Sequence, residues 1–314
     1  MKIFKKSFKT AMISLALGAL MMTTGCGGSD SADTSSAGGE DGVFTIAYAP
    51  NESTDQSTDA RNGLAQELSK TLGCEVKEIQ ASDYNAIIEA LRTGKADMAY
   101  MGPLAIALGV ERAEITPIVM KAEDGDPNKA VYHSVLITNA KNTDINSIKD
   151  IKGKTMAFVD PDSTSSNLVP SAEIIKAFPQ DNLTSEKLHT NDSFFHAVSF
   201  SGSHQAGLQA VAKGDVDIAP VSDQILASEI SKGNVNKDDI KVIHKSAAIP
   251  AEAMVVAKSV DEKTRNTLTE FLTTYDNEAY FTDVIKKAGA RFIKCNISDY
   301  QPIIELNNII NNKG

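Results

Sequence analysis

Apolar positions after residue 42 follow two different spacings. Short apolar runs at residues 43–49 and 98–101 are typical of buried strands. Between them, apolar side chains recur at i, i+3, i+4 and i+7 over residues 83–92, which predicts a helix with Ser82 or Asp83 as its N-cap. Strands and helices in this alternation predict right-handed βαβ units, and hence an α/β fold with a mostly parallel sheet covered by helices.

One sequence pattern occurs twice, first at residues 90–99 and again 120 residues later. In each copy a helical segment ends at a glycine, Gly94 or Gly214, and the chain enters a strand through an aspartate, Asp97 or Asp217. Any turn from a helix to a strand can have this form. The functional interpretation is that the two copies belong to two lobes with the same architecture.

Two segments are expected to cross between these lobes. Residues 131–138 have the composition of one long strand, and residues 249–257 have that of a second. The chain would leave lobe one at the first crossing and return at the second. The expected division is lobe one at 43–131 plus 257–314, lobe two at 138–248, and hinge crossings at 132–137 and 249–256. Two hinge strands would allow the lobes to close on a ligand.

The first 26 residues have the form of an export signal. Lysines precede an apolar run at residues 11–22, which is too short to span a bilayer stably, and small residues lead to Cys26. The ending resembles the lipobox of bacterial lipoproteins, although Thr23 replaces the usual leucine. This resemblance implies a signal peptide at 1–25, lipid attachment to Cys26, and a polar tether at 26–42 with a reach on the order of 20 Å.

Charge and cysteine content narrow the class of partner. From Cys26 onward the chain has 27 basic and 41 acidic side chains, a formal charge of −14, which argues against nucleic acid or an anionic membrane surface as the main partner. Tryptophan is absent, so a broad stacking platform is not expected. Cys74 and Cys295 either pair or remain free thiols. Because no CxxC or histidine-rich spacing occurs, we expect no metal and no cofactor.

Clustered hydroxyl groups mark residues 160–170 as a candidate anion site. Ser163, Thr164, Ser165 and Ser166 lie between an apolar run and a helical pattern. Hydroxyl groups and unpaired N–H groups at the start of a helix can hold an anion without a matching positive charge. The stretch contains no lysine or arginine. The simpler alternative is an ordinary N-cap.

Several segments together resemble the substrate-binding lipoproteins of phosphate, phosphite and phosphonate ABC transporters. The most specific is the Ser-Thr-Ser motif at residues 163–165, and the others are residues 83–84, 97–103, 201–204 and 249–252. The resemblance covers nearly all of the chain after Cys26. It implies a two-lobed type II periplasmic-binding-protein fold with a ligand clamped between the lobes.

The resemblance also implies roles for particular residues. In lobe two, Ser163, Thr164 and Ser165 would donate hydrogen bonds to phosphoryl oxygens. His204, in the first turn of a helix that Ser201 is expected to cap, would face the same anion. From lobe one, the resemblance implies contacts by Tyr84, Tyr100 and Met101, although Tyr84 also fits a core position on its helix.

The resemblance also implies that acidic and amide residues determine whether the ligand carries an amine. Glu252 occupies a position where the family has an acid, and it would accept a hydrogen bond from a P–OH group or pair with a ligand amine. Family members that bind aminoalkylphosphonates have a second acidic residue. The corresponding residue in this chain is Asp223 or Gln224. An amide at this position, as in Gln224, would stabilise a ligand amine less than a carboxylate would. The expected ligand is therefore a small phosphorus oxyanion or a simple alkylphosphonate.

The expected protein is a monomeric, non-enzymatic binding protein that is lipid-anchored outside the cytoplasm and delivers its ligand to an ABC transporter permease. One alternative keeps the fold and binds another small organic molecule, for which Tyr84, Tyr100, Phe194 and Phe195 could supply aromatic walls. A weaker alternative is a serine hydrolase with Ser163 or Ser165 as nucleophile and His204 as base. No Gly-x-Ser-x-Gly motif supports it.

Overall fold

The computed structural model describes residues 42–50, 52 and 55–311, all of which belong to one compact unit. The expected signal peptide, Cys26 and the tether up to residue 41 lie outside the described residues. Within the described residues, none of the helices is long and apolar enough to cross a membrane.

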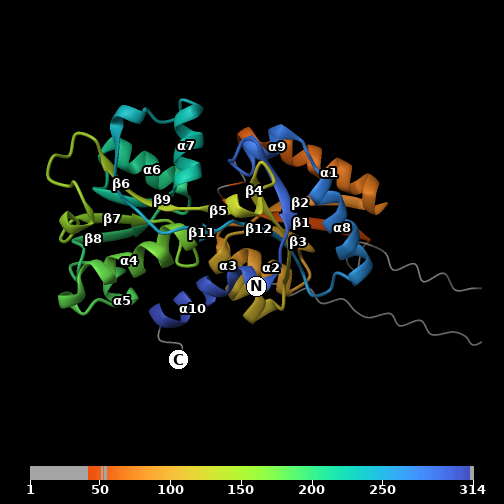
Figure 1. Cartoon of the computed structure of the whole chain (residues 1–314), viewed down its shortest axis with the longest axis horizontal. Helices are drawn as coiled ribbons and strands as arrows, with labels where there is room; N and C mark the ends of the chain where they lie inside the picture. The colour runs from red at the N-terminus through yellow and green to blue at the C-terminus, as the bar shows by residue number, and fades with distance from the viewer. Residues whose placement is uncertain (1–41, 51, 53–54, 312–314) are drawn as a thin grey trace, which may run out of the picture. The chain divides into compact units, whose positions relative to one another are not determined.

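Lobe one is built on a mixed sheet with the strand order β13–β4–β12–β3–β1–β2 (Figure 1). These strands span Ala290–Lys294, Thr116–Glu123, Ala253–Val256, Met98–Met101, Val43–Tyr48 and Glu75–Gln80. Its helices are α1 (Thr58–Leu72), α2 (Tyr84–Arg92), α3 (Pro103–Ala113), α8 (Glu262–Thr274), α9 (Glu278–Asp283) and α10 (Gln301–Ile310). One apolar cluster joins the sheet to these helices, so β3 is buried along its whole length and β1 along most of it.

Lobe two is built on a second mixed sheet with the strand order β10–β6–β9–β7–β8 (Figure 1). The strands span Ile240–Lys245, Ser134–Asn139, Ile218–Ser222, Thr155–Phe158 and Ala197–Phe200, and the helices are α4 (Val169–Ala177), α5 (Ser185–Leu188), α6 (His204–Lys213) and α7 (Asp223–Ser231). Alternate side chains of β6 and β7 enter two separate apolar clusters. This period of two is what a sheet covered on both faces requires.

The α/β two-lobed fold agrees with expectation, but neither sheet is mostly parallel. Strands β1, β2 and β3 run parallel, whereas β12 pairs antiparallel with both β3 and β4. In lobe two, β7 is parallel to β8 and β9, whereas β6 is antiparallel to β9 and β10. Strands β6 and β12 come directly from the other lobe without a crossover helix, and this connection allows the antiparallel direction.

Each expected crossing strand is interrupted. Strands β5 (Val131–Tyr132) and β11 (Ile249–Pro250) pair antiparallel in a small separate sheet, and β6 and β12 begin only after a break. At the first break the N–H of His133 donates to Asp223 Oδ1 at 3.0 Å, so His133 makes no strand pairing there. Residues 134–137 of the first expected crossing and 253–256 of the second therefore lie in the two large sheets.

The repeated sequence pattern has the same structure in both lobes. Gly94 and Gly214 both adopt positive φ, at 72° and 81°. Asp97 Oδ2 accepts a hydrogen bond from the N–H of Thr45 in β1, and Asp217 Oδ2 accepts one from the N–H of Thr155 in β7, both at 2.8 Å. In each lobe the aspartate therefore ties the third strand of the βαβ unit to the first.

The question of the cysteines is settled by their positions. Cys74 precedes β2 and Cys295 follows β13, and these strands form opposite edges of the lobe-one sheet. Both are free thiols.

Candidate functional site

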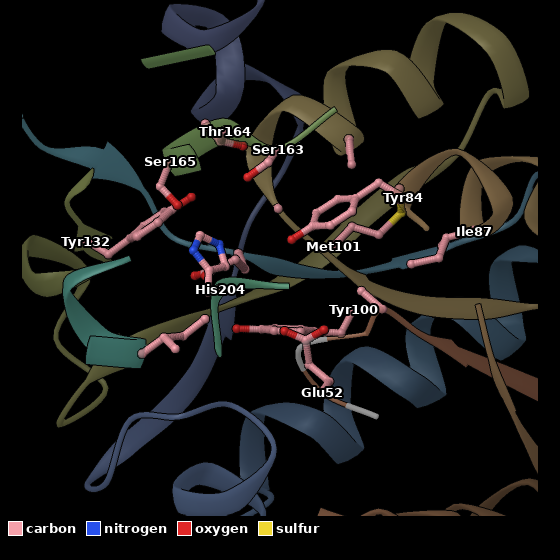
Figure 2. A pocket seen from close by; sticks show the side chains of 15 residues that line it. Glu52, Tyr84, Ile87, Tyr100, Met101, Tyr132, Ser163, Thr164, Ser165 and His204 are labelled. Carbon is pink, nitrogen blue, oxygen red and sulfur yellow. The ribbon is translucent and has the colours of Figure 1, made fainter. Parts of the chain in front are cut away.

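A small cavity of about 30 Å³ lies where the two lobes meet (Figure 2). Most of its lining comes from segments that follow parallel strands at their carboxyl ends, and Tyr132 and Glu252 come from the crossings. In open α/β sheets, this edge is where ligands bind. The lining residues are Ala49, Glu52, Tyr84, Ile87, Tyr100, Met101, Gly102, Ala105, Tyr132, Ser163, Thr164, Ser165, His204, Ile225 and Glu252.

The Ser-Thr-Ser motif forms one wall of the cavity. Ser163 is the N-cap of a short π-helix, η4 (Thr164–Leu168), and its Oγ accepts the N–H of Ser166 at 3.2 Å. The capping interpretation is thus correct for Ser163, and the same side chain lines the cavity. Ser134 Oγ donates to the carbonyl of Ser165 at 2.6 Å, which fixes the motif to β6.

Thr164 connects this wall to lobe one. Its Oγ1 accepts the N–H of Leu104, in the first turn of α3, at 2.8 Å. Because the oxygen accepts here, the hydroxyl hydrogen remains for an acceptor in the cavity. Gly102, the N-cap of α3, also lines the cavity, so the positive end of a second helix faces it.

His204 is the first residue of α6 and is buried in the cavity wall. Its helix is capped by Ser203, whose Oγ accepts the N–H of Ala206 at 3.1 Å, and not by Ser201 as expected. The Nδ1 atom of His204 accepts the N–H of Ser222 at 3.2 Å. Burial, with a smaller effect of Lys121, lowers the pKa of His204 to about 3. The ring is therefore neutral, and its proton is on Nε2.

Three tyrosines line the cavity as well. Tyr84 and Tyr100 lie where the sequence predicted, and Met101 lies beside them (Figure 2). Tyr132 was missed, and interactions with Ser165 and Thr164 oppose in part the rise in its pKa. Burial raises the pKa of Tyr100 and Tyr132, so both phenol groups are neutral.

An ion pair that the sequence did not indicate involves one residue of the cavity lining. Glu252 lines the cavity, and its Oε2 lies 2.7 Å from Nζ of Lys121 in β4. The carboxylate is therefore neutralised by a cation of the chain itself. A second carboxyl group, that of Glu52, also lines the cavity, and burial followed by the nearby Glu252 raises its pKa to about 8.

Gln224 does not line this cavity. Its Nε2 donates to the carbonyl of Val131 at 3.3 Å, and it lines a more open hollow with Asp223 instead of the cavity. Asp223 is bonded to His133. The reason is the helical period: successive residues of α7 point about 100° apart, and Ile225 takes the direction into the cavity.

Two alternative functions lose support. Phe194 and Phe195 pack in an apolar cluster of lobe two, so they add no aromatic wall to the cavity. A general base works best with a pKa near the working pH, whereas the pKa of His204 is lowered to about 3. The lowered pKa of His204 therefore disfavours its role as the base of a serine hydrolase.

Some residues that line the cavity could have been found from the sequence. Glu52 follows the first strand, where the carboxyl-end rule places ligand contacts, and Tyr132 lies in the predicted first crossing. Lys121 had no such signal, because its role depends on strand β4 lying next to β12.

Neutral hydroxyl groups, a neutral imidazole and helix N-termini converge on a cavity between two α/β lobes. This combination defines a type II periplasmic binding protein with a site suited to a small anion. A family model described as the periplasmic substrate-binding protein of phosphonate ABC transporters matches residues 46–300. The chain belongs to this family.

Individual relatives agree with this family assignment. The phosphate-import protein PhnD of Mycolicibacterium smegmatis is 32% identical over 233 residues, which cover 73% of this chain and 70% of that protein. The phosphonates-binding periplasmic protein of Escherichia coli is 30% identical over 229 residues, which cover 71% of this chain and 63% of that protein. The crystal structure of a binding protein component of a phosphonate transporter from Pseudomonas aeruginosa superposes with a TM-score of 0.72, at 26% identity over 86% of each chain.

Proposed function

We propose that the cavity binds a phosphorus oxyanion with at most a short substituent, namely phosphite, phosphate or a simple alkylphosphonate, for delivery to an ABC transporter permease. The observation that carries this proposal is the convergence of neutral donors and helix N-termini on one small cavity. The named M. smegmatis and E. coli relatives import phosphate and bind phosphonates, respectively.

In this proposal the donors surround the phosphoryl group. Ser163, Thr164 and Ser165 donate from lobe two, and His204 donates through Nε2–H. Tyr84, Tyr100 and Met101 complete the site from lobe one, together with Tyr132 from the crossing. Because these groups are neutral, the anion is stabilised by hydrogen bonds and helix dipoles without a charged side chain in contact.

Two observations favour a short ligand. A cavity of about 30 Å³ is comparable with roughly two buried water molecules, so a long substituent has little room. Lys121 already neutralises Glu252, so a ligand amine would gain less from that carboxylate. These observations replace the argument from Gln224, which lies outside the cavity.

Closure of the lobes would bring these groups together, with β5 and β11 as the hinge. Three contacts support closure, because each joins the lobes away from the hinge. Besides the bond from Leu104 to Thr164, the N–H of Tyr84 donates to Asp160 Oδ2 at 3.5 Å, and Nζ of Lys232 lies 2.8 Å from Oδ1 of Asp283.

The remaining parts of the proposal concern the setting of the protein. We infer that it is a monomeric, non-enzymatic protein, anchored to the extracytoplasmic side of the cell membrane through lipid on Cys26. The support is the sequence of residues 1–42, with a basic head, an apolar run and a polar tether.

Isothermal titration calorimetry of residues 42–314 tests the ligand. Phosphite, phosphate, methylphosphonate and 2-aminoethylphosphonate are titrated separately, with sulfate and methanesulfonate as anions of similar shape that lack phosphorus. We expect binding of at least one of the first three anions with Kd below about 10 μM, and weaker binding of the aminoalkyl compound. Absence of heat with all phosphorus compounds at millimolar concentration would contradict the proposal.

A further inference from the structure

Glu52 occupies the side of the cavity opposite the Ser-Thr-Ser motif. It lies after β1, is only 9% exposed and lines the cavity. Figure 2 shows its carboxyl group beside the ring of Tyr100, whereas Ser163, Thr164 and Ser165 lie across the cavity. No role for Glu52 follows from the motifs in the sequence, so its function has to be inferred from its position.

The backbone of Glu52 is held by buried groups. Its carbonyl oxygen accepts hydrogen bonds from Nη1 of Arg61 at 2.7 Å and from Oγ of Ser57 at 2.5 Å. Arg61 is only 2% exposed and is itself paired with Glu78 at 3.1 Å. These contacts fix the residue at the cavity without using its carboxyl group.

The carboxyl group is left with an unmet bonding capacity. Its Oε2 is buried and has no hydrogen-bond partner among the described residues. A buried polar atom in this condition is unfavourable, so a ligand that bonds to it would be stabilised. The hydroxyl group of Tyr100 is in the same condition beside it, which gives this side of the cavity two polar groups for a ligand.

The charges around Glu52 favour a neutral carboxyl group. Glu252 faces it from the second crossing, and Lys121 of β4 is paired with Glu252. Lys286, after α9, donates to the carbonyl of Asp283 and opposes the effect of Glu252 only in part. Tyr100 faces it from β3 and is neutral. Burial and Glu252 together raise the pKa of Glu52 to about 8.

We propose that Glu52 is a ligand-contacting residue that donates a hydrogen bond from its neutral carboxyl group to an oxygen of the phosphorus oxyanion. This proposal rests on the proposed function. The donor set would then reach the anion from both sides, with the Ser-Thr-Ser motif on one side and Glu52 with Tyr100 on the other. Loss of the Glu52 proton would place a carboxylate against the anion, so binding should weaken in alkaline solution.

The test compares the affinity for methylphosphonate of wild-type protein, Glu52→Gln and Glu52→Ala between pH 6.5 and 9. Glutamine keeps the shape and a donor but does not ionise. At pH 6.5 we expect Glu52→Gln within about threefold of wild type and Glu52→Ala weaker by about tenfold or more. At pH 9 wild type should have weakened about tenfold relative to Glu52→Gln, because its carboxyl group is then mostly ionised.

The design separates several effects. Ionisation of methylphosphonate itself cancels in the ratio of the two Kd values, since both proteins bind the same ligand. Glu173→Gln is the matched control, because Glu173 is a half-buried carboxylate bonded to His244 outside the cavity, and it should follow wild type at each pH. Calorimetry at pH 9 in buffers of different ionisation enthalpy should show about one more proton taken up by wild type than by Glu52→Gln.

Two results would overturn the inference. If the ratio of the Kd of wild type to the Kd of Glu52→Gln stays constant from pH 6.5 to 9, Glu52 does not contact the anion. Equal loss in Glu52→Gln and Glu52→Ala at pH 6.5 would mean that the affinity does not depend on a hydrogen bond donated by residue 52. If wild type fails to bind phosphite, phosphate and methylphosphonate alike, the proposed function fails with it, which is a separate outcome.

Discussion

The hydroxyl oxygen of Thr164 accepts a hydrogen bond from the N–H of Leu104 in the other lobe, and the same side chain lines the cavity. Thr164→Val keeps the shape and removes the hydroxyl group. We expect the free energy of binding for methylphosphonate to weaken by about 1–3 kcal/mol, measured by calorimetry. Thr164→Ser keeps the hydroxyl group and should stay close to wild type. Unchanged affinity of Thr164→Val would place the anion elsewhere.

His204 links the cavity to the pH dependence of stability. Its pKa is lowered to about 3 in the fold, so between pH 6.5 and 3 the unfolded chain binds more protons, and stability falls as the pH falls. From pH 7 to 5 this group alone should remove about 2 kcal/mol. His204→Asn keeps an acceptor near the Nδ1 position and cannot protonate. Measured by urea denaturation, its free energy of unfolding should therefore fall by about 2 kcal/mol less than that of wild type between pH 7 and 5. Equal losses would mean that His204 is not buried as a neutral ring.

At the residue scale the sequence predicted most of the cavity. Ser163, Thr164, Ser165 and His204 were found because local motifs carry them, and all of them line it. Lys121 was missed because its importance depends on its contact with Glu252, which is distant in the sequence. Glu52 was missed although it follows the first strand, where the carboxyl-end rule places ligand contacts. Gln224 does not line the cavity, because a shift of one residue along a helix changes the direction of a side chain.

At the scale of elements, the paired aspartates explain why the same pattern recurs in both lobes. Asp217 Oδ2 accepts from both the N–H and Oγ1 of Thr155, each at 2.8 Å. Asp217→Ala leaves these donors without their acceptor, and we expect the free energy of unfolding to fall by about 1.5–3 kcal/mol in urea denaturation. Asp215→Ala, at an exposed position two residues earlier, should change it by no more than about 0.5 kcal/mol. Similar effects of both variants would contradict this role.

Element prediction succeeded where the signal was local. Strand β3 and helix α2 agree with expectation, and Asp83 caps α2 by accepting the N–H of Ala86 at 2.7 Å. The direction of β6 and β12 and the breaks in the crossings were not predictable in this way. They depend on which distant strand each segment pairs with, and apolar periodicity does not report strand direction.

At the scale of the whole molecule, the proposed lipid anchor would be attached to Cys26, which lies outside the described residues. Cys26→Ser removes the thiol that would carry the lipid. We expect wild type expressed in a bacterial host to sediment with membranes, and the variant to be recovered in the soluble extracytoplasmic fraction. Binding of methylphosphonate by the variant should be unchanged, because the cavity is formed by residues 49–252. Membrane sedimentation of Cys26→Ser equal to wild type would contradict lipid attachment at this residue.

The two-lobed arrangement could be predicted from the repeated pattern and the two crossings, whereas the state of closure could not. The proposed closure would depend on contacts such as that of Lys232 with Asp283, which joins lobe two to the end of α9. Both side chains of this pair are partly exposed, and ion pairs that remain accessible to water contribute little alone. We therefore expect ligand contacts to stabilise the closed arrangement more than this pair does.

The most direct test is a crystal structure of residues 42–314 with bound methylphosphonate. We predict the phosphonate group in the cavity between the lobes, with its oxygens within about 3.2 Å of the Thr164 hydroxyl group and of Nε2 of His204. Density for the ligand at any other place, with Thr164 and His204 making no contact to it, would contradict the account.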